Sequence, residues 1–123
     1  MSSFEVVGGK KLSGTIHPQG AKNEALQIIC AVLLSKEKII IKNVPDIIDV
    51  NKLIDLLKSL GVKVRKTSKG TFEFQSNHID LNYLNTEDFE LKGKSLRGSI
   101  MIVGPLLARF GIASIPRPGG DKI

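Results

Sequence analysis

The chain has 123 residues, 41% of them hydrophobic and 24% charged, and it carries a formal net charge of +6. This length is typical of one domain, and the composition allows a packed core, which argues against an intrinsically disordered protein. No apolar run approaches the roughly 18 residues that span a bilayer. The N-terminus lacks the pattern of a signal peptide, and the single cysteine excludes an internal disulfide or a cysteine metal cluster. These features favour the cytoplasm.

The basic charge is compatible with nucleic-acid binding, because lysine and arginine neutralise phosphates. However, aromatic residues for base stacking make up only 5% of the chain. The basic residues are also scattered over separate expected elements, at residues 10–11, 36–38, 63–66 and 92–94. A small substrate carrying several phosphates would need a basic cleft equally. The charge therefore favours a small anionic ligand over a nucleic acid.

In chain order, residues 4–9 and 12–18 predict two short strands joined by a Gly-Gly-Lys-Lys turn. A helix is then expected over residues 23–34. Its only polar interior residue is Gln27, so this helix should be buried on nearly every side rather than amphipathic.

A strand and a second helix should follow. Residues 38–44 predict a strand of β-branched residues that ends at a proline. Asp46 or Asp49 would cap the next helix, and Gly61 would end it. Its apolar residues recur with helical spacing, at Leu53, Leu56, Leu57 and Leu60.

Residues 62–65 and 71–74 alternate with period two around a Ser-Lys-Gly turn, which predicts a hairpin. A looser segment is expected over residues 78–90. Strands that alternate with helices predict an α/β (α+β) fold with at least partly parallel strand pairing.

Two expected helix starts place a cation where an anion would bind. In residues 20–26, Lys22 lies where a helix start offers unpaired backbone N–H groups and a partial positive charge. Phosphate or carboxylate is the natural ligand. The plainer alternative is that Asn23 caps the helix while Lys22 lies in solvent. Residues 93–99 likewise place a cation ahead of the apolar run 100–107.

The two helix regions align with each other at a constant offset of about 73 residues. The aligned pairs are Ile28 and Met101, Ile29 and Ile102, Leu33 and Leu106, Leu34 and Leu107, Lys36 and Arg109, and Ile39 and Ile112. This offset exceeds the roughly 20 to 50 residues of solenoid repeats and fits a duplicated unit of several strands and helices. A chance alignment of two apolar helices is the alternative.

A last short strand is expected over residues 112–115, followed by a loop rich in proline and glycine. The prolines restrict the backbone at the start of this loop and the glycines leave its tip mobile, as expected of a flap over a site. Asp121 lies at the tip, and an ordinary solvated acid is the alternative for it. Because no element closes this loop, we expect the chain to be a piece of a larger fold.

Five motifs, in this order, resemble the N-terminal part of the UDP-N-acetylglucosamine enolpyruvyl transferases. They lie at residues 20–26, 43–50, 96–100, 104–111 and 118–121. The related enolpyruvylshikimate-phosphate synthases share the fold but carry a Ser-Lys-Ser pattern where this chain has Ala21, Lys22 and Asn23. The Lys-Asn pair favours the aminosugar enzymes. A 3-phosphoshikimate enolpyruvyl transferase and a non-catalytic basic binding module stay as alternatives.

The resemblance implies a fold of two lobes, each an inside-out α/β barrel built from βαβαββ repeats with helices packed inward. Residues 1–21 would belong to the other lobe of the full-length protein. Residues 22–123 would form an incomplete lobe, with the first repeat and the start of the second. The chain alone is then expected to be inactive, and it could self-associate through exposed edges.

The resemblance also implies the reaction. The enolpyruvyl group of phosphoenolpyruvate passes to the 3′-hydroxyl of UDP-N-acetylglucosamine, and phosphate is released through a tetrahedral intermediate. This is the first committed step of bacterial peptidoglycan synthesis and needs no metal or organic cofactor. The implied partners are these two small substrates, with no nucleic acid and no membrane.

The site residues follow from the same resemblance. Lys22 and Asn23 match the pair that contacts phosphoenolpyruvate, with Lys22 stabilising the phosphate and developing charge. Arg97 matches the arginine that contacts the UDP-sugar. Asp121 falls where most members carry a loop cysteine and some carry aspartate, and its implied role is the general acid. Cys30, within an apolar helix, is expected to be core packing instead.

Overall fold

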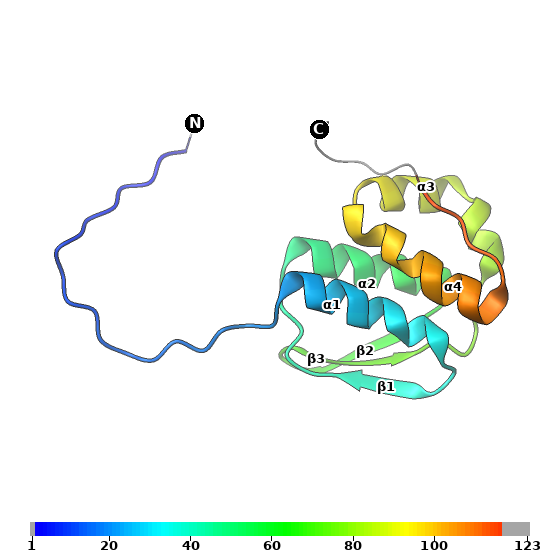
Figure 1. Ribbon diagram of the computed structural model, residues 1–123, viewed down its shortest axis with the longest axis horizontal. Helices are drawn as coiled ribbons and strands as arrows, with labels where there is room; N and C mark the ends of the chain where they lie inside the picture. The colour runs from blue at the N-terminus through cyan, green and yellow to red at the C-terminus, as the bar shows by residue number, and fades with distance from the viewer. Residues whose placement is uncertain (1, 117–123) are drawn as a thin grey trace.

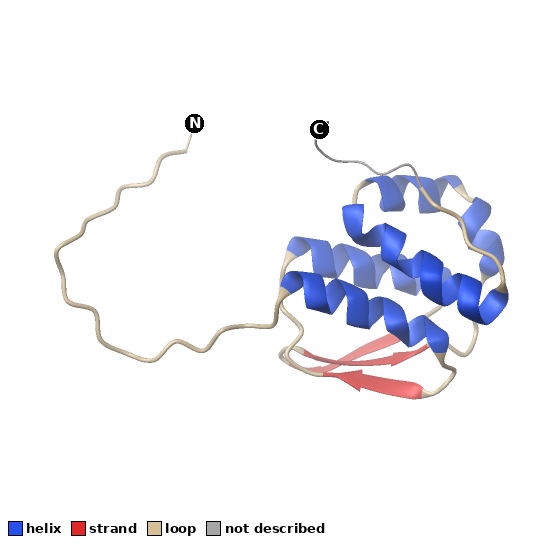
Figure 2. Ribbon diagram, viewed as in Figure 1, coloured by secondary structure: helices blue, strands red, loops and turns tan. Residues whose placement is uncertain are grey.

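The structure is a computed structural model that describes residues 2–116. Three strands form one sheet, and the helices lie on one side of it (Figures 1 and 2). Helices α1 and α2 lie nearest the sheet, and α3 and α4 lie farther away. Each helix in this part of the chain is too short or too polar to cross a bilayer. The elements are α1 (Lys22–Ala31), the 3-10 helix η1 (Val32–Leu34), β1 (Lys38–Ile41), α2 (Ile48–Leu60), β2 (Lys63–Ser68), β3 (Thr71–Gln75), the 3-10 helix η2 (Leu81–Asn85), α3 (Glu87–Lys94), the 3-10 helix η3 (Arg97–Ile102) and α4 (Val103–Phe110).

The sheet has the order β1-β3-β2, and both pairs of neighbours are antiparallel. The predicted hairpin is confirmed as β2 and β3, with Gly70 in the left-handed region at a φ of 70°. The expected parallel pairing is wrong for these strands. β1 and β2 do run in the same direction, but the hairpin folds β3 between them, so β1 pairs with the free edge of β3 instead.

Helix α2 confirms the predicted apolar spacing. Its buried side chains face the sheet and α1, and they are Val50, Leu53, Ile54, Leu56, Leu57 and Leu60. Gly61 ends the helix as expected, at a φ of 112°. The predicted acidic cap is wrong, because Ile47 holds the N-cap position and no side chain caps the helix. Asp46 instead accepts a hydrogen bond from Asn51 Nδ2 at 2.9 Å, and Asp49 lies in the first turn.

The predicted first helix is confirmed as α1 followed by η1. The helix was expected to be buried on nearly every side, but only one of its sides is buried and the other is exposed. Ile29 and Cys30 are buried, whereas Ile28 is 44% and Leu34 52% exposed. Within residues 2–116, the sheet, α2, η3 and α4 cover only one side of this helix. Cys30 is core packing as predicted, and burial raises the pKa of its thiol to about 12.

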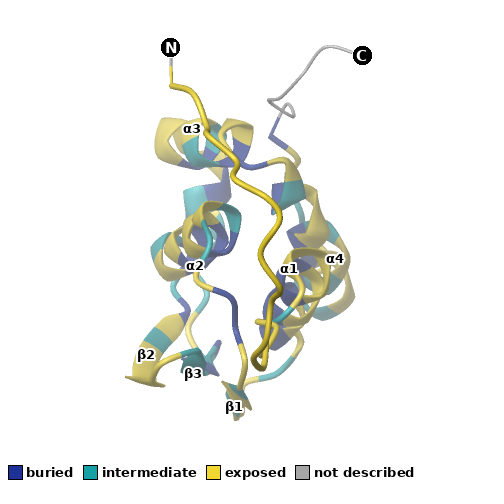
Figure 3. Ribbon diagram, turned by 90° about the vertical axis from the view of Figure 1, so that its left-hand side faces the viewer, coloured by how far each residue is buried: buried dark blue, intermediate teal, exposed yellow. Residues whose placement is uncertain are grey.

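The N-terminal segment carries none of the predicted strands. Residues 2–19 extend away from the body without regular structure, and their side chains are exposed (Figures 1 and 3). The alternating pattern of residues 4–9 and 12–18 has no strand partner among the described residues, so no ladder of hydrogen bonds forms. Residues 112–115 likewise form no strand.

The expected loose segment over residues 78–90 instead contains η2 and the start of α3. Thr86 caps α3, because its Oγ1 accepts a hydrogen bond from Phe89 N at 3.2 Å. Acidic residues occupy the first turn and lysines the last, which matches the helix dipole. This charge order was the signal that could have revealed the helix.

A cluster of polar contacts joins α3 to α2 and to η2. Lys92 Nζ lies 3.2 Å from Asp55 Oδ2 and donates a hydrogen bond to Ser59 Oγ, both on α2. Tyr83 Oη, on η2, donates to Asp88 Oδ2 at 2.6 Å. Burial and this hydrogen bond raise the pKa of Tyr83 to about 12.

We expect Tyr83 to ionise near pH 12 in the folded chain and near pH 10 when the chain is unfolded. The raised pKa stabilises the fold fully below about pH 10, and that contribution is lost as the pH rises to about 12. The chain has one tyrosine and no tryptophan, so phenolate absorbance after rapid mixing reports Tyr83 alone. Asp88→Asn should lower the midpoint. A midpoint near pH 10 in the folded chain would contradict the assigned environment.

Four of the six aligned pairs in the two segments have matching environments. Ile29 and its counterpart Ile102 are buried, as are Leu33 and Leu106. Two further pairs, Ile28 with Met101 and Leu34 with Leu107, are exposed. The last two pairs differ, because Lys36 is exposed and Arg109 half-buried, whereas Ile39 is half-buried and Ile112 exposed. Helix α4 packs on η1, where Arg109 Nη1 donates to Leu33 O at 2.8 Å. This agreement supports a duplicated unit, although Ile112 has no strand where Ile39 has one.

Candidate functional site

Lys22 and Asn23 are the first two residues of α1. The residue before them, Ala21, holds the N-cap position in an extended conformation, and no side chain caps the helix. Asn23 therefore does not act as the cap, which rules out the cap role that was the plainer alternative. The first-turn N–H groups of an uncapped helix are open to an external acceptor, and the helix dipole favours an anion there.

Arg97 begins η3, immediately after α3, and its side chain is exposed. The expected second helix start is therefore a 3-10 turn, and the other cation in this region, Lys94, pairs with Glu90 at the end of α3. Element η3 packs closely on α1, because an added Cβ at Gly98 would lie 3.0 Å from Leu26 Cδ1. A larger residue at Gly98 would require the Leu26 side chain to shift, and this close packing places Arg97 in one pocket with the start of α1.

Lys22, Asn23 and Arg97 line one pocket of about 340 Å³. The remaining lining residues are Leu26, Gln27, Asp49, Gly98, Ile100 and Met101. Within residues 2–116, the Asn23 amide and the Arg97 guanidinium make no hydrogen bond or ion pair. Three of the four predicted site residues are thus brought together, with two cations and one amide available to a ligand. The fourth, Asp121, lies outside the described residues.

Asp49 is a member of this pocket that sequence reasoning did not identify as such. Its Oδ2 lies 2.9 Å from Lys22 Nζ, and both side chains remain partly exposed. The sequence predicts Asp49 only as a helix cap, although this residue lies within the family-like run of residues 43–50. The pairing depends on α1 and α2 packing side by side, which residue spacing alone does not show.

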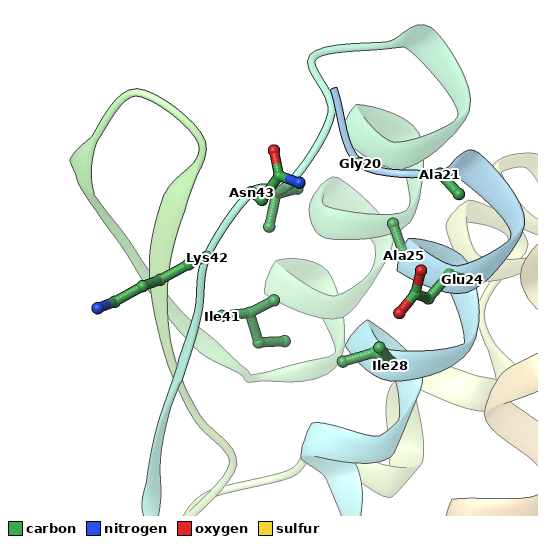
Figure 4. Close-up of a pocket in the computed structure, with 9 residues that line it drawn as sticks. Gly20, Ala21, Glu24, Ala25, Ile28, Ile41, Lys42 and Asn43 are labelled. Carbon is green, nitrogen blue, oxygen red and sulfur yellow. The ribbon is translucent and has the colours of Figure 1, made fainter. Parts of the chain in front are cut away.

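A smaller pocket of about 100 Å³ lies between the start of α1 and the end of β1 (Figure 4). Glu24 points into this space, with Ile28 and Ile41 on its walls, while Lys42 points away. An acidic side chain and an outward lysine do not suit an anionic ligand. The larger pocket, with Lys22 and Arg97, is therefore the better candidate for phosphate or carboxylate.

The chain is similar to known enolpyruvyl transferases. Residues 6–123 match the family model described as EPSP synthase (3-phosphoshikimate 1-carboxyvinyltransferase). The UDP-N-acetylglucosamine 1-carboxyvinyltransferases of Bacteroides fragilis and Porphyromonas gingivalis are 55% and 52% identical over 123 residues. Each alignment covers 100% of this chain and 28% of the relative, so the chain spans about 28% of the length of these curated relatives.

A solved structure supports the fold. The enolpyruvyl transferase NikO from Streptomyces tendae matches with a TM-score of 0.63 and 21% identity, over 85% of this chain and 23% of that chain. The expected fold class is confirmed, with the chain as part of an inside-out α/β architecture. Because the family model matches all but the first five residues, the chain belongs to the EPSP synthase family of enolpyruvyl transferases.

Proposed function

We propose that this chain is the N-terminal portion of a UDP-N-acetylglucosamine enolpyruvyl transferase, acting in bacterial peptidoglycan synthesis in the cytoplasm. The observation that carries the proposal is the pocket in which Lys22, Asn23 and Arg97 meet. The 55% identity to relatives with this name supports the same substrate pair.

In this proposal, Lys22 and Asn23 hold phosphoenolpyruvate at the start of α1, and Arg97 contacts the UDP-sugar. The 3′ oxygen of the sugar bonds to C2 of phosphoenolpyruvate, while Asp121 delivers a proton to the C3 methylene. The hydroxyl proton passes to a base. Phosphate then leaves as its C–O bond breaks, and loss of a proton from the new methyl group restores the double bond. Cations already in place stabilise the developing charge best.

The lobe assignment is part of the same proposal. Residues 1–21 would join the other lobe of the longer protein, and residues 22–123 would form an incomplete lobe. Large apolar side chains along the N-terminal segment are at least 90% exposed, and they would gain cover from such a lobe: Phe4, Val6, Leu12 and Ile16. The chain alone would be inactive, and its uncovered edges could pair with a second copy.

A second candidate reaction uses 3-phosphoshikimate as the acceptor, since the matching family model carries that description. Phosphate release from phosphoenolpyruvate should therefore be measured with each acceptor. The proteins to compare are the 123-residue chain, the full-length protein and full-length Asp121→Asn. We expect release only with UDP-N-acetylglucosamine and only from the unmodified full-length protein. A silent full-length protein, or release only with 3-phosphoshikimate, would overturn the aminosugar assignment, and a fully active Asp121→Asn would overturn the acid role.

The full-length protein should resist fosfomycin, which inactivates this family by alkylating the loop cysteine. A carboxylate at Asp121 is a much weaker nucleophile towards an epoxide than a thiolate. Cys30 cannot substitute, because it is 1% exposed and its thiol pKa is raised to about 12 by burial. Asp121→Cys should become sensitive, which mass spectrometry of the adduct would show. Rapid inactivation of the unmodified protein with an adduct on Asp121 would contradict the prediction.

A further inference from the structure

The Lys22–Asp49 ion pair lies at the wall of the proposed phosphate pocket. Lys22 is the first residue of α1, and Asp49 is in the first turn of α2, so the pair connects two neighbouring helix starts. Figure 1 shows α1 and α2 side by side with these ends close together. The same two side chains also line a second hollow of about 580 Å³, with Asp46, Ile47, Ile48 and Asn51. The pair is thus the shared wall of two open spaces.

Fold stability does not account for this pair. The side chains of Lys22 and Asp49 are 50% and 40% exposed, and ion pairs at that exposure contribute little to folding. Asp49 caps no backbone N–H of α2 either. A carboxylate in an anion pocket also repels the ligand. Its presence therefore calls for a role that outweighs this repulsion.

We propose that Asp49 is a positioning residue that holds the Lys22 ammonium at the wall facing Arg97. The inference rests on the proposed function, because it concerns the same site. A lysine side chain is a point charge on a flexible stem, so its ammonium can occupy many positions unless a partner fixes one. Without Asp49, Lys22 is free to turn into the second hollow, where the carboxylate of Asp46 offers another partner. With Asp49, the charge is already in place when the transition state forms.

This arrangement predicts a particular kinetic signature in the full-length protein. Asp49→Asn removes both the repulsion and the orientation. The KM for phosphoenolpyruvate should stay unchanged or fall, while kcat should fall between about 10- and 100-fold. Asp49→Glu should restore part of kcat, because it keeps the carboxylate. In a Lys22→Met background, Asp49→Asn should cause no further loss, since the two residues act as a unit.

Asp46→Asn is the matched control. It removes the same charge from the same region, and its amide oxygen can still accept the hydrogen bond from Asn51. We expect kcat to stay within about twofold of the unmodified protein. An equal fall of kcat in Asp46→Asn and Asp49→Asn would overturn the inference, because it would indicate a general charge effect. Unchanged kcat in Asp49→Asn, or additive losses with Lys22→Met, would overturn it as well.

A second readout separates this inference from the proposed function. Lysine-selective NMR of the full-length protein reports the Lys22 ammonium directly, with Lys22→Met assigning the signal. Asp49→Asn should shift that signal and speed its hydrogen exchange, and Asp46→Asn should not. If the unmodified protein releases no phosphate, the proposed function fails, and the ammonium signal decides the inference alone. An identical signal in Asp49→Asn would overturn it.

Discussion

Replacing Lys22 by methionine in the full-length protein should lower kcat/KM for phosphoenolpyruvate between about 100- and 1,000-fold. Methionine has a similar length but no charge, so the pocket keeps its shape and loses the cation that we propose binds the phosphate. Lys22 lies at an uncapped helix start, and Arg97 is the other cation lining that pocket. One cation of two should be responsible for a large share of the transition-state stabilisation.

Steady-state kinetics with varied phosphoenolpyruvate would test this expectation. Lys58→Met is the matched control, because Lys58 is an exposed lysine in the last turn of α2, outside the Lys22 pocket. We expect the control to change kcat/KM less than about twofold. Thermal unfolding should be nearly the same for both variants, since an exposed ion pair contributes little. If Lys22→Met and Lys58→Met behaved alike, the role of the α1 start in binding phosphoenolpyruvate would be wrong.

Local sequence patterns predicted those elements whose stability is mainly local. The leucine spacing of α2, its terminal Gly61 and the Ser-Lys-Gly hairpin turn are all confirmed. In each case a few neighbouring residues decide the backbone conformation. Helix α3 was not predicted, because most of its residues are polar. The sequence features that indicate it are the capping residue Thr86 and the order of the charges, acidic first and basic last.

Strand pairing was predicted less well because it depends on contacts far apart in the sequence. The pairing of β1 with β3 joins residues more than thirty positions apart, such as Ile39 with Phe74. The N-terminal alternation also predicted strands, but the segment forms none and has no strand partner within residues 2–116. A period of two shows that a segment could be a strand, and only a partner edge makes it one.

The candidate site shows the same difference between what local patterns predict and what long-range packing decides. Lys22 followed from a helix start, and the site roles of Asn23 and Arg97 followed from motifs that the resemblance supplied. Their convergence in one pocket is a property of the packed structure, since η3 lies against α1 through Gly98. Asp49 could not be found from spacing, because its partner is 27 residues away on another helix.

Replacing Phe74 by alanine should destabilise the chain by about 3–5 kcal/mol, the usual cost of deleting a buried aromatic side chain. Phe74 is fully buried on the central strand, opposite Ile39 of β1 and Val64 of β2. Its ring also lies 6.1 Å from the ring of Phe72. The substitution therefore leaves a cavity where all three strands meet the helices.

Urea unfolding of the chain would measure this loss, with Phe4→Ala as the matched control. Phe4 is 95% exposed, so the same chemical change there should alter the free energy of unfolding by less than about 0.5 kcal/mol. Phe74→Leu should fall between the two, because leucine refills part of the cavity. Equal midpoints for Phe74→Ala and Phe4→Ala would contradict the packing of the sheet against α1 and α2. A free energy of unfolding that falls from phenylalanine through leucine to alanine at position 74 would place the centre of the core at β3, the strand between β1 and β2.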